Sequence, residues 1–315
     1  MKVRLLGTAA GGGFPQWNCA CPNCDGLRRG TLRACPRREL CIAISGNDRD
    51  WFLINAPPDL HAQIASFPAL APHGDVRATS IAGVLLTSAD LDNVLGLMVL
   101  REGPPVHVYA TAGVQRALQA GGLAFSQLLA NYAPPVWHEP ATSRSALPPL
   151  RGPTSGLEYQ VFEVDTHQPR YLGYEDSSFH EIIADRSGYE FWDTDGKRLV
   201  VLTGVSSLKP GVHTPTANHL ERIRDCNLLL LDGSFWSEDE LRTKTQSGRT
   251  ASQMGHLRVG GPNGSLELIQ GLNIRRAIYV HINNTNPILN EDSAEHKAVR
   301  AAGVEVGYDG LEIEL

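Results

Sequence analysis

Residues 81–101 read IAGVLLTSADLDNVLGLMVLR, and this stretch decides the fold class. Ile81 to Thr87 is an apolar run with the length of a buried strand, and it ends at the polar segment SADLDN. Val94 to Arg101 follow with enough apolar residues for a buried helix. A strand, a polar loop and a helix in this order predict a layered α/β structure.

The same order recurs on both sides of this stretch. Further strands are predicted at 3–7, 41–45, 51–55, 106–110, 158–165, 198–203, 227–232, 277–281, 305–308 and 311–314. Helical spacing occurs at 60–67, 113–118 and 216–224. Residues 133–154, rich in Pro, Ser and Ala, are predicted to form a connecting loop. Because strands interleave with single helices, the sequence predicts mixed sheets layered with helices.

The composition is that of an ordinary globular protein. The chain has 315 residues, of which 42% are hydrophobic and 20% charged. A formal net charge of -6 argues against a nucleic-acid-binding surface, which needs clustered Lys and Arg. No apolar run approaches the ~18 residues of a membrane-spanning helix, and the start MKVRLLGTAA is unlike a signal peptide. We therefore expect a cytoplasmic protein that binds neither nucleic acid nor membrane.

Polar side chains come directly after the ends of five of the predicted strands. They are Asp59, Asp90, Asp92, Asp165, His167, Asp232 and His281. One such residue is usually a helix cap or a turn residue, but five strands that end in this way favour a shared site, since ligand-binding groups of α/β folds collect at strand ends. Carboxylates and imidazoles together suit a divalent metal: oxygen ligands favour Fe(II), Mn or Mg, and imidazoles accept Zn or Fe. With an open position, such a metal can activate water or dioxygen.

Three further stretches are rich in functional groups. MGHLRVGGPNGS places His256 beside glycines, HINNTNP puts three asparagines after His281, and LREG puts Arg101 and Glu102 at the end of a predicted helix. Each also has a structural interpretation. The asparagines can hydrogen-bond turns, and Arg101 with Glu102 can be an exposed ion pair.

The segment WNCACPNC, residues 17–24, holds three of the six cysteines. It could form a disulfide, a redox site, a metal site or a catalytic centre. Thiols in the cytosol are normally kept reduced, so a metal site is favoured over a disulfide.

Several blocks resemble the PqqB family of pyrroloquinoline quinone (PQQ) biosynthesis, in the metallo-β-lactamase superfamily. They are LLGTAAGGGFPQWNCACPNC, LREG, LLLDGSFWSEDE, MGHLRVGGPNGSLE and HINNTNPIL. The resemblance runs from end to end of the chain. It implies a single metallo-β-lactamase-like domain over residues 1–315, an αββα sandwich of two mixed β-sheets flanked by helices.

The resemblance also implies a structural zinc at Cys19, Cys21 and Cys24, with His281 as the expected fourth ligand. Three thiolates and one imidazole form a closed tetrahedral set. Such a site stabilises the protein and leaves no open position for catalysis.

For the active site, the resemblance implies an iron-dependent hydroxylase that acts on a tyrosine-derived ring. Asp90, Asp92, Asp232 and His256 are the expected groups near the metal, with His167 and Asn93 as further candidate ligands. Arg101 is the expected partner of a substrate carboxylate, because a guanidinium pairs well with it. The superfamily signature His-x-His-x-Asp-His is replaced here by Ser88-Ala89-Asp90-Leu91-Asp92-Asn93, and Asn93 stands where PqqB proteins usually have His.

Two other functions stay open. One is a non-catalytic carrier of PQQ or its precursor, in which Asn93 marks the loss of a metal ligand. The other is a metal-dependent hydrolase, although zinc hydrolases with two metal ions rely on the full histidine set. The expected partner is a small aromatic amino-acid substrate, and the sequence leaves a homodimer open.

Overall fold

The structure is a computed structural model that describes residues 1–72, 74, 76–119, 125–167, 169, 171, 184–210, 218–245 and 247–315. The chain divides into two units. The first contains Met1–Leu6, Cys41–Lys197 and Glu312–Leu315, and the second contains Gly7–Leu40 and Arg198–Leu311. No helix among the described residues is both long and apolar enough to cross a membrane. The single domain expected over residues 1–315 stays a prediction.

The first unit is built on a mixed sheet of short apolar strands. Its order is β14 (Glu312–Glu314), β1 (Lys2–Gly7), β2 (Cys41–Ser45), β3 (Trp51–Ile54), β4 (Ile81–Leu85), β5 (His107–Tyr109) and β6 (Val136–His138). The pairs β14–β1 and β2–β3 are antiparallel, whereas β3 to β6 run parallel. The strands predicted at 41–45 and 51–55 thus form an antiparallel hairpin around residues 46–50. The inner parallel strands β3 and β4 are entirely buried, as is usual when helices cover a parallel sheet, whereas the edge strand β6 is partly exposed.

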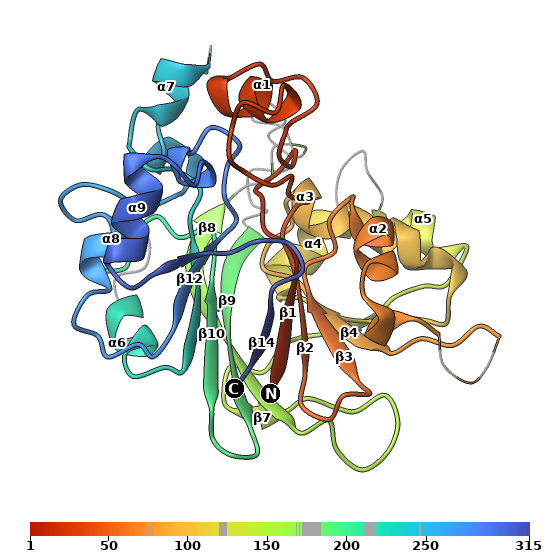
Figure 1. Ribbon diagram of the computed structural model, residues 1–315. Coiled ribbons are helices and arrows are strands. Elements are labelled where there is room, and N and C mark those ends of the chain that lie inside the picture. The colour runs from red at the N-terminus through yellow and green to blue at the C-terminus, as the bar shows by residue number, and fades with distance from the viewer. Residues whose placement is uncertain are drawn as a thin grey trace. The chain divides into compact units, whose positions relative to one another are not determined.

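Short helices follow the parallel strands of the first unit (Figure 1). They are α2 (Leu60–Ala65), η1 (Pro68–Leu70), α3 (Leu91–Val94), η2 (Leu95–Glu102), α4 (Ala112–Gln119) and α5 (Phe125–Ala130). Leu60, Leu97 and Val114 from these helices join one hydrophobic core with Leu53 and Val84 from the strands. The helix predicted at 94–101 is thus mostly a 3₁₀-helix, preceded by one turn of α-helix.

Gly96 lets η2 pack directly on the loop after β3. Its N–H donates to the Ala56 carbonyl at 2.7 Å, and an added Cβ would lie 2.3 Å from the Pro57 oxygen. We expect Gly96→Ala to lower the free energy of unfolding by about 1–3 kcal/mol, because backbone rather than a flexible side chain must move. Urea denaturation measures the change. Gly103→Ala is the matched control, since its Cβ would meet no atom closer than 3.5 Å, and an unchanged stability in Gly96→Ala would contradict this packing.

Three more strands of the first unit form an antiparallel group. They are β7 (Ser145–Ala146), β8 (Leu157–His167) and β9 (Ala184–Asp193). The region 133–154, predicted to be loop only, contains β6 and β7. The strand β9 was not predicted at all. It contains Gly188, which lies opposite Phe162, where an added Cβ would meet the Phe162 ring at 2.3 Å.

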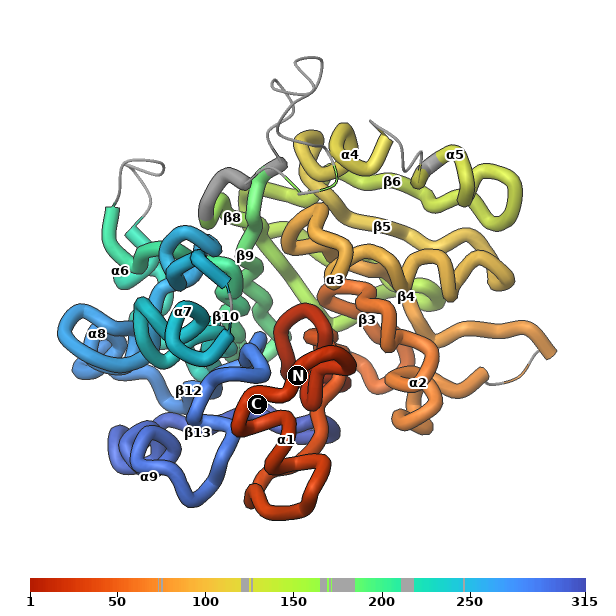
Figure 2. Tube along the Cα trace, turned by 90° about the horizontal axis from the view of Figure 1, so that it is seen from above, coloured from red at the N-terminus to blue at the C-terminus, as the bar shows by residue number. Residues whose placement is uncertain are grey.

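The second unit carries four parallel strands, and helices lie beside them in Figure 2. The strands are β10 (Arg198–Leu202), β11 (Leu228–Asp232), β12 (Ala277–Val280) and β13 (Glu305–Val306), paired in that order. The helices are α1 (Pro22–Arg28), α6 (His219–Ile223), α7 (Glu240–Lys244), η6 (Ser252–Met254), α8 (Ser265–Leu268), η7 (Pro287–Leu289) and α9 (Ala294–Ala301). Because the strands are parallel, their carboxyl ends meet at one edge and bring the loops after β11 and β12 together.

Candidate metal centres

The loops after β11 and β12 build the first candidate site. Asp232 is the last residue of β11 and pairs in register with Val280, the last residue of β12. His281, the first residue of the loop after β12, therefore lies close to Asp232. His281 has a left-handed φ of 54°, an uncommon conformation for a residue other than glycine. His256 comes from the turn that follows η6. Strained backbone of this kind is often found at functional sites.

Asp232, His256 and His281 each bring one potential ligand atom within 4.8 Å of the others. Asp232 Oδ2 lies 2.9 Å from His256 Nδ1 and 3.8 Å from His281 Nδ1. The two imidazole rings stack at a centroid distance of 5.3 Å. The Asp232 side chain is 1% exposed, and the two histidine side chains are 10% and 12% exposed. Two imidazoles and one carboxylate are the donor set of many non-haem iron sites.

Asp232 is held in its charged form. Burial alone would favour the neutral acid, but the neighbouring His256 and His281 and the N–H of Ser234 outweigh it, so the pKa of Asp232 lies well below its ordinary value. The Gly204 N–H donates to Oδ2 at 2.6 Å, and the Ser234 N–H donates to Oδ1 at 3.0 Å. The site therefore carries a fixed negative charge in a buried position, which favours a cation.

The second candidate site is the cysteine cluster. Cys19, Cys21 and Cys24 place their sulfurs within 4.8 Å of one another, and Pro22 begins α1 directly after Cys21. Cys24 is fully buried and Cys21 nearly so. Burial raises the pKa of Cys21 to about 12. Three thiolates at this spacing need a cation to balance their charge, and they fit a zinc site.

The prediction that His281 is the fourth ligand of this cluster is wrong. Its Nδ1 lies 2.9 Å from Ser234 Oγ in the Asp232 site, and it is absent from the group of ligand atoms at the cysteines. Asn284 occupies the place instead: its Nδ2 lies 3.1 Å from Cys19 Sγ and 3.2 Å from Cys24 Sγ. Residues three positions apart, His281 and Asn284, thus contact different sites.

Asp90, Asp92 and Asn93 belong to the first unit, where they follow β4. Asn93 Nδ2 donates to Ser88 Oγ at 2.8 Å, and Ser88 Oγ donates to Asp90 Oδ2 at 3.0 Å. Arg186 on β9 forms an ion pair with Asp90 at 3.7 Å. Among the described residues, neither Asp90 nor Asp92 belongs to a group of three His, Cys, Asp or Glu ligands. Asn93 thus holds the loop through Ser88, and its part in a metal site stays a prediction.

Comparisons with known proteins decide the family. The model of the beta-lactamase superfamily domain matches residues 50–282. Over 317 residues the chain is 38% identical to coenzyme PQQ synthesis protein B of Cupriavidus necator, with 100% of this chain and 99% of the relative covered. It is 39% identical to the same protein of Ectopseudomonas mendocina, with both chains fully covered. The chain belongs to the PqqB family.

The solved structures agree with this assignment. The crystal structure of Zn(2+)-bound PqqB from Methylobacterium extorquens is 34% identical, covers 100% of both chains and superposes with a TM-score of 0.86. The predicted metallo-β-lactamase-like fold is therefore confirmed. A diphosphatase of the PhnP family, with 17% identity and a TM-score of 0.63, shares the fold alone.

Arg101 and His167 were also predicted to belong to the active site of this PqqB-family chain. The exposed Arg101 donates to the Met98 carbonyl at 2.7 Å, pairs with Glu102 at 3.4 Å and stacks over Tyr132. These are the contacts of a surface ion pair, and substrate binding by Arg101 stays a prediction. His167 ends β8, but its side chain lies outside the described residues.

Ser234 was missed in the sequence. Its hydroxyl contacts both histidines of the Asp232 site, at 3.0 Å from His256 Nδ1 and 2.9 Å from His281 Nδ1. The sequence feature that could have indicated Ser234 is its position two residues after Asp232, a carboxylate that ends a strand. Serine at such a position usually caps a turn, so sequence alone did not single it out.

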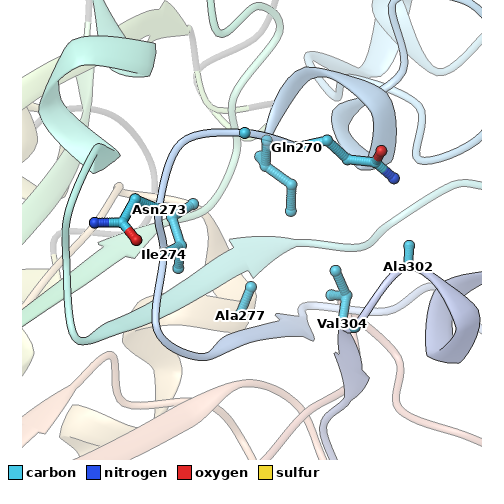
Figure 3. Close-up of a pocket in the computed structure, with 9 residues that line it drawn as sticks. Gln270, Asn273, Ile274, Ala277, Ala302 and Val304 are labelled. Carbon is cyan, nitrogen blue, oxygen red and sulfur yellow. The ribbon is translucent and has the colours of Figure 1, made fainter.

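A cleft of about 420 Å³ lies in the second unit (Figure 3). Its lining residues are Ile269, Gln270, Gly271, Asn273, Ile274, Ala277, Ala302, Gly303 and Val304. None of these side chains carries a charge or an ordinary metal ligand. The cleft can hold an apolar group, but its residue types supply no acid, base or nucleophile.

Proposed function

We propose that this PqqB-family protein acts in PQQ synthesis as an iron-dependent enzyme that uses dioxygen to hydroxylate a tyrosine-derived aromatic intermediate. The observation that carries the proposal is the group of Asp232, His256 and His281. It supplies two imidazoles and one carboxylate, the set that leaves open positions on non-haem Fe(II). The family supports the pathway, because the similar proteins are coenzyme PQQ synthesis proteins.

The donor groups fit such an ion. Within the described part of the chain, Asp232 accepts hydrogen bonds from Gly204 and His256 on Oδ2 and from Ser234 on Oδ1. A carboxylate offers about four lone-pair sites, so Oδ1 keeps one for a cation. The burial of Asp232 removes competing water, and its depressed pKa keeps it charged.

When bound, iron supplies the redox chemistry that brings dioxygen into reaction with the ring. The chain's own residues do the positioning. Asp232 Oδ2 lies 2.9 Å from His256 Nδ1 and keeps that ring beside the carboxylate. The stacked His281 ring shares the burial of the site, so that little water reaches it. The cysteine cluster would hold zinc separately, as a support for the loop that carries α1.

Reconstitution tests the proposal. Purified protein is loaded with Fe(II) without oxygen, then given dioxygen, an electron donor such as ascorbate and a peptide that carries the tyrosine-derived ring. The donor is required because the second oxygen atom of dioxygen must be reduced to water. We expect a product heavier by one oxygen atom in mass spectrometry. Loss of this product in Asp232→Ala, with retention in Asp239→Asn, ties it to the site, whereas no oxygen gain with iron bound contradicts the proposal.

A carrier function is the second candidate, and the Asn93–Ser88 hydrogen bond favours it. An amide that holds its own loop is a poor substitute for a histidine ligand. Metal analysis and ligand titration separate the two functions. A metal bound in addition to the cysteine-bound zinc supports the enzyme, and tight binding of PQQ without that metal supports the carrier.

A further inference from the structure

One loop, residues 281–286, takes part in both candidate metal sites. It fills the six positions between the end of β12 and the start of η7. Its first residue, His281, belongs to the Asp232 site. Its fourth residue, Asn284, contacts the cysteine cluster, with the side-chain amide nitrogen 3.1 Å from Cys19 Sγ. The two sites therefore share one short piece of backbone, which we call the shared loop.

Asn23 ties the cysteine cluster to the shared loop. It lies between Cys21 and Cys24 near the start of α1 and is 8% exposed. Its Nδ2 donates to the Asn284 carbonyl at 3.0 Å and to the Asn286 carbonyl at 2.9 Å. A carbonyl oxygen only accepts hydrogen bonds, so the amide nitrogen is the donor in both. The segment that carries Cys21 and Cys24 is thus bonded to the shared loop at two points.

Asn286 connects the shared loop to the Asp232 site. It is fully buried, and its Nδ2 donates to the Gly233 carbonyl at 2.8 Å, while its Oδ1 accepts a backbone N–H at the start of η7. Gly233 lies between Asp232 and Ser234 in the chain. The Asn283 N–H also donates to the Ser234 carbonyl, at 3.2 Å. The shared loop is therefore bonded to the backbone on both sides of Gly233.

The cysteine end of this network depends on what holds α1 in place. Cys21 is the N-cap of α1 but makes no side-chain capping hydrogen bond, and the helix has seven residues. A helix of this length is not stable by itself, so it depends on contacts with the rest of the chain. Three thiolates that share a zinc ion would hold the start of α1, and Asn23 with it. Without the ion, the two hydrogen bonds from Asn23 to the shared loop lose this anchor.

We propose that Asn23 and Asn286 are positioning residues that couple the two metal sites, so that zinc at the cysteine cluster strengthens metal binding at the Asp232 site. This inference rests on the proposed function and adds the connection between its two sites. A buried network of satisfied hydrogen bonds is rigid, and rigid contacts are a physical route for such coupling. By linkage, a metal at the Asp232 site strengthens zinc binding by the same factor.

The first test measures Fe(II) affinity without dioxygen or substrate in zinc-loaded parent, Asn23→Ala and Asn286→Ala. Zinc analysis shows that the cysteine cluster stays filled. We expect about 10-fold weaker Fe(II) binding in each variant, within the ordinary range of coupling between two sites. Asn227→Ala is the matched control and should bind like the parent, because Asn227 bonds to the Arg198 N–H at the opposite end of β11 from Asp232. Affinity equal to the parent's in either of the other two variants contradicts the proposal.

The second test measures the coupling itself. Mn(II), which favours carboxylate over thiolate ligands, is titrated into folded protein with and without zinc, and the EPR signal of free Mn(II) is followed. We expect zinc to tighten Mn(II) binding about 10-fold in the parent and in Asn227→Ala, but not in Asn23→Ala. An asparagine that only supports the fold would leave the effect of zinc unchanged.

The outcomes separate this proposal from the proposed reaction. Equal Mn(II) affinity with and without zinc in the folded parent overturns the coupling, whereas absence of hydroxylation with the coupling intact contradicts the reaction alone. A parent that binds neither Fe(II) nor Mn(II) contradicts the metal site on which both depend. The first test needs only zinc-loaded protein, so it decides the matter even where the zinc-free chain does not fold.

Discussion

Cys21→Ser is expected to lower the melting temperature strongly and to release one zinc per chain. A structural zinc contributes apparent binding free energy on the order of 10 kcal/mol in small zinc domains, and less in a large protein with its own core. Cys21 is 6% exposed, so a serine there would leave a buried hydroxyl where a thiolate is needed. Thermal unfolding and metal analysis measure the two effects.

The matched control is Cys35→Ser, because Cys35 is exposed and lies outside the cluster.

Substitution of Asn284 tests the position of the fourth zinc ligand beside the three cysteines. We expect Asn284→Ala to weaken zinc binding and Asn284→His to keep it, since imidazole is a regular zinc ligand. A Cys21→Ser variant that melts like the parent and keeps its zinc would show that the cluster is not a structural metal site.

Asp232→Ala is expected to abolish metal binding at the histidine site and, with it, product formation. The side chain accepts hydrogen bonds from Gly204, Ser234 and His256, so its loss removes a candidate ligand and the partner that orients His256. Loss of an orienting partner alone costs about 10- to 100-fold in metal affinity, and we expect a larger loss here. Metal titration and mass spectrometry of the product measure the effect.

Asp239→Asn serves as the control for Asp232→Ala. Asp239 is an exposed carboxylate of the same unit, paired with Arg242, and its loss should change neither metal affinity nor turnover. Circular dichroism must show that Asp232→Ala is folded. A folded variant that binds iron as tightly as the parent would remove Asp232 from the metal site.

The sequence predicted the strands correctly where a run of consecutive residues is buried. The strand predicted at 227–232 is β11 at Leu228–Asp232, and the strand predicted at 277–281 is β12 at Ala277–Val280. Both are runs of apolar residues in a parallel group, where burial on both faces gives an unmistakable pattern. The strand β9 lacked this pattern, because Ala184–Asp193 contains Gly188 and four charged residues, at positions 185, 186, 190 and 193.

The sequence predicted the types of residue that form the metal sites, but only partly which residues lie together in each site. Asp232 and His256 were expected near one metal, and the structure brings them together with His281. The sequence could not assign His281 and Asn284 to their sites, because both lie in one loop and only their contacts in the folded chain distinguish them. The contacts of Ser234 depend on the register of β11 and β12, which no local pattern encodes.

Turnover under isotope-labelled dioxygen tests the central claim most directly. The iron-loaded protein is given labelled dioxygen in ordinary water, and the mass of the product from the tyrosine-derived substrate is measured. An oxygenase centred on Asp232, His256 and His281 predicts that the label enters the product and that Asp232→Ala forms none. A product that takes its oxygen from water, or an unchanged substrate with iron bound, would contradict the account.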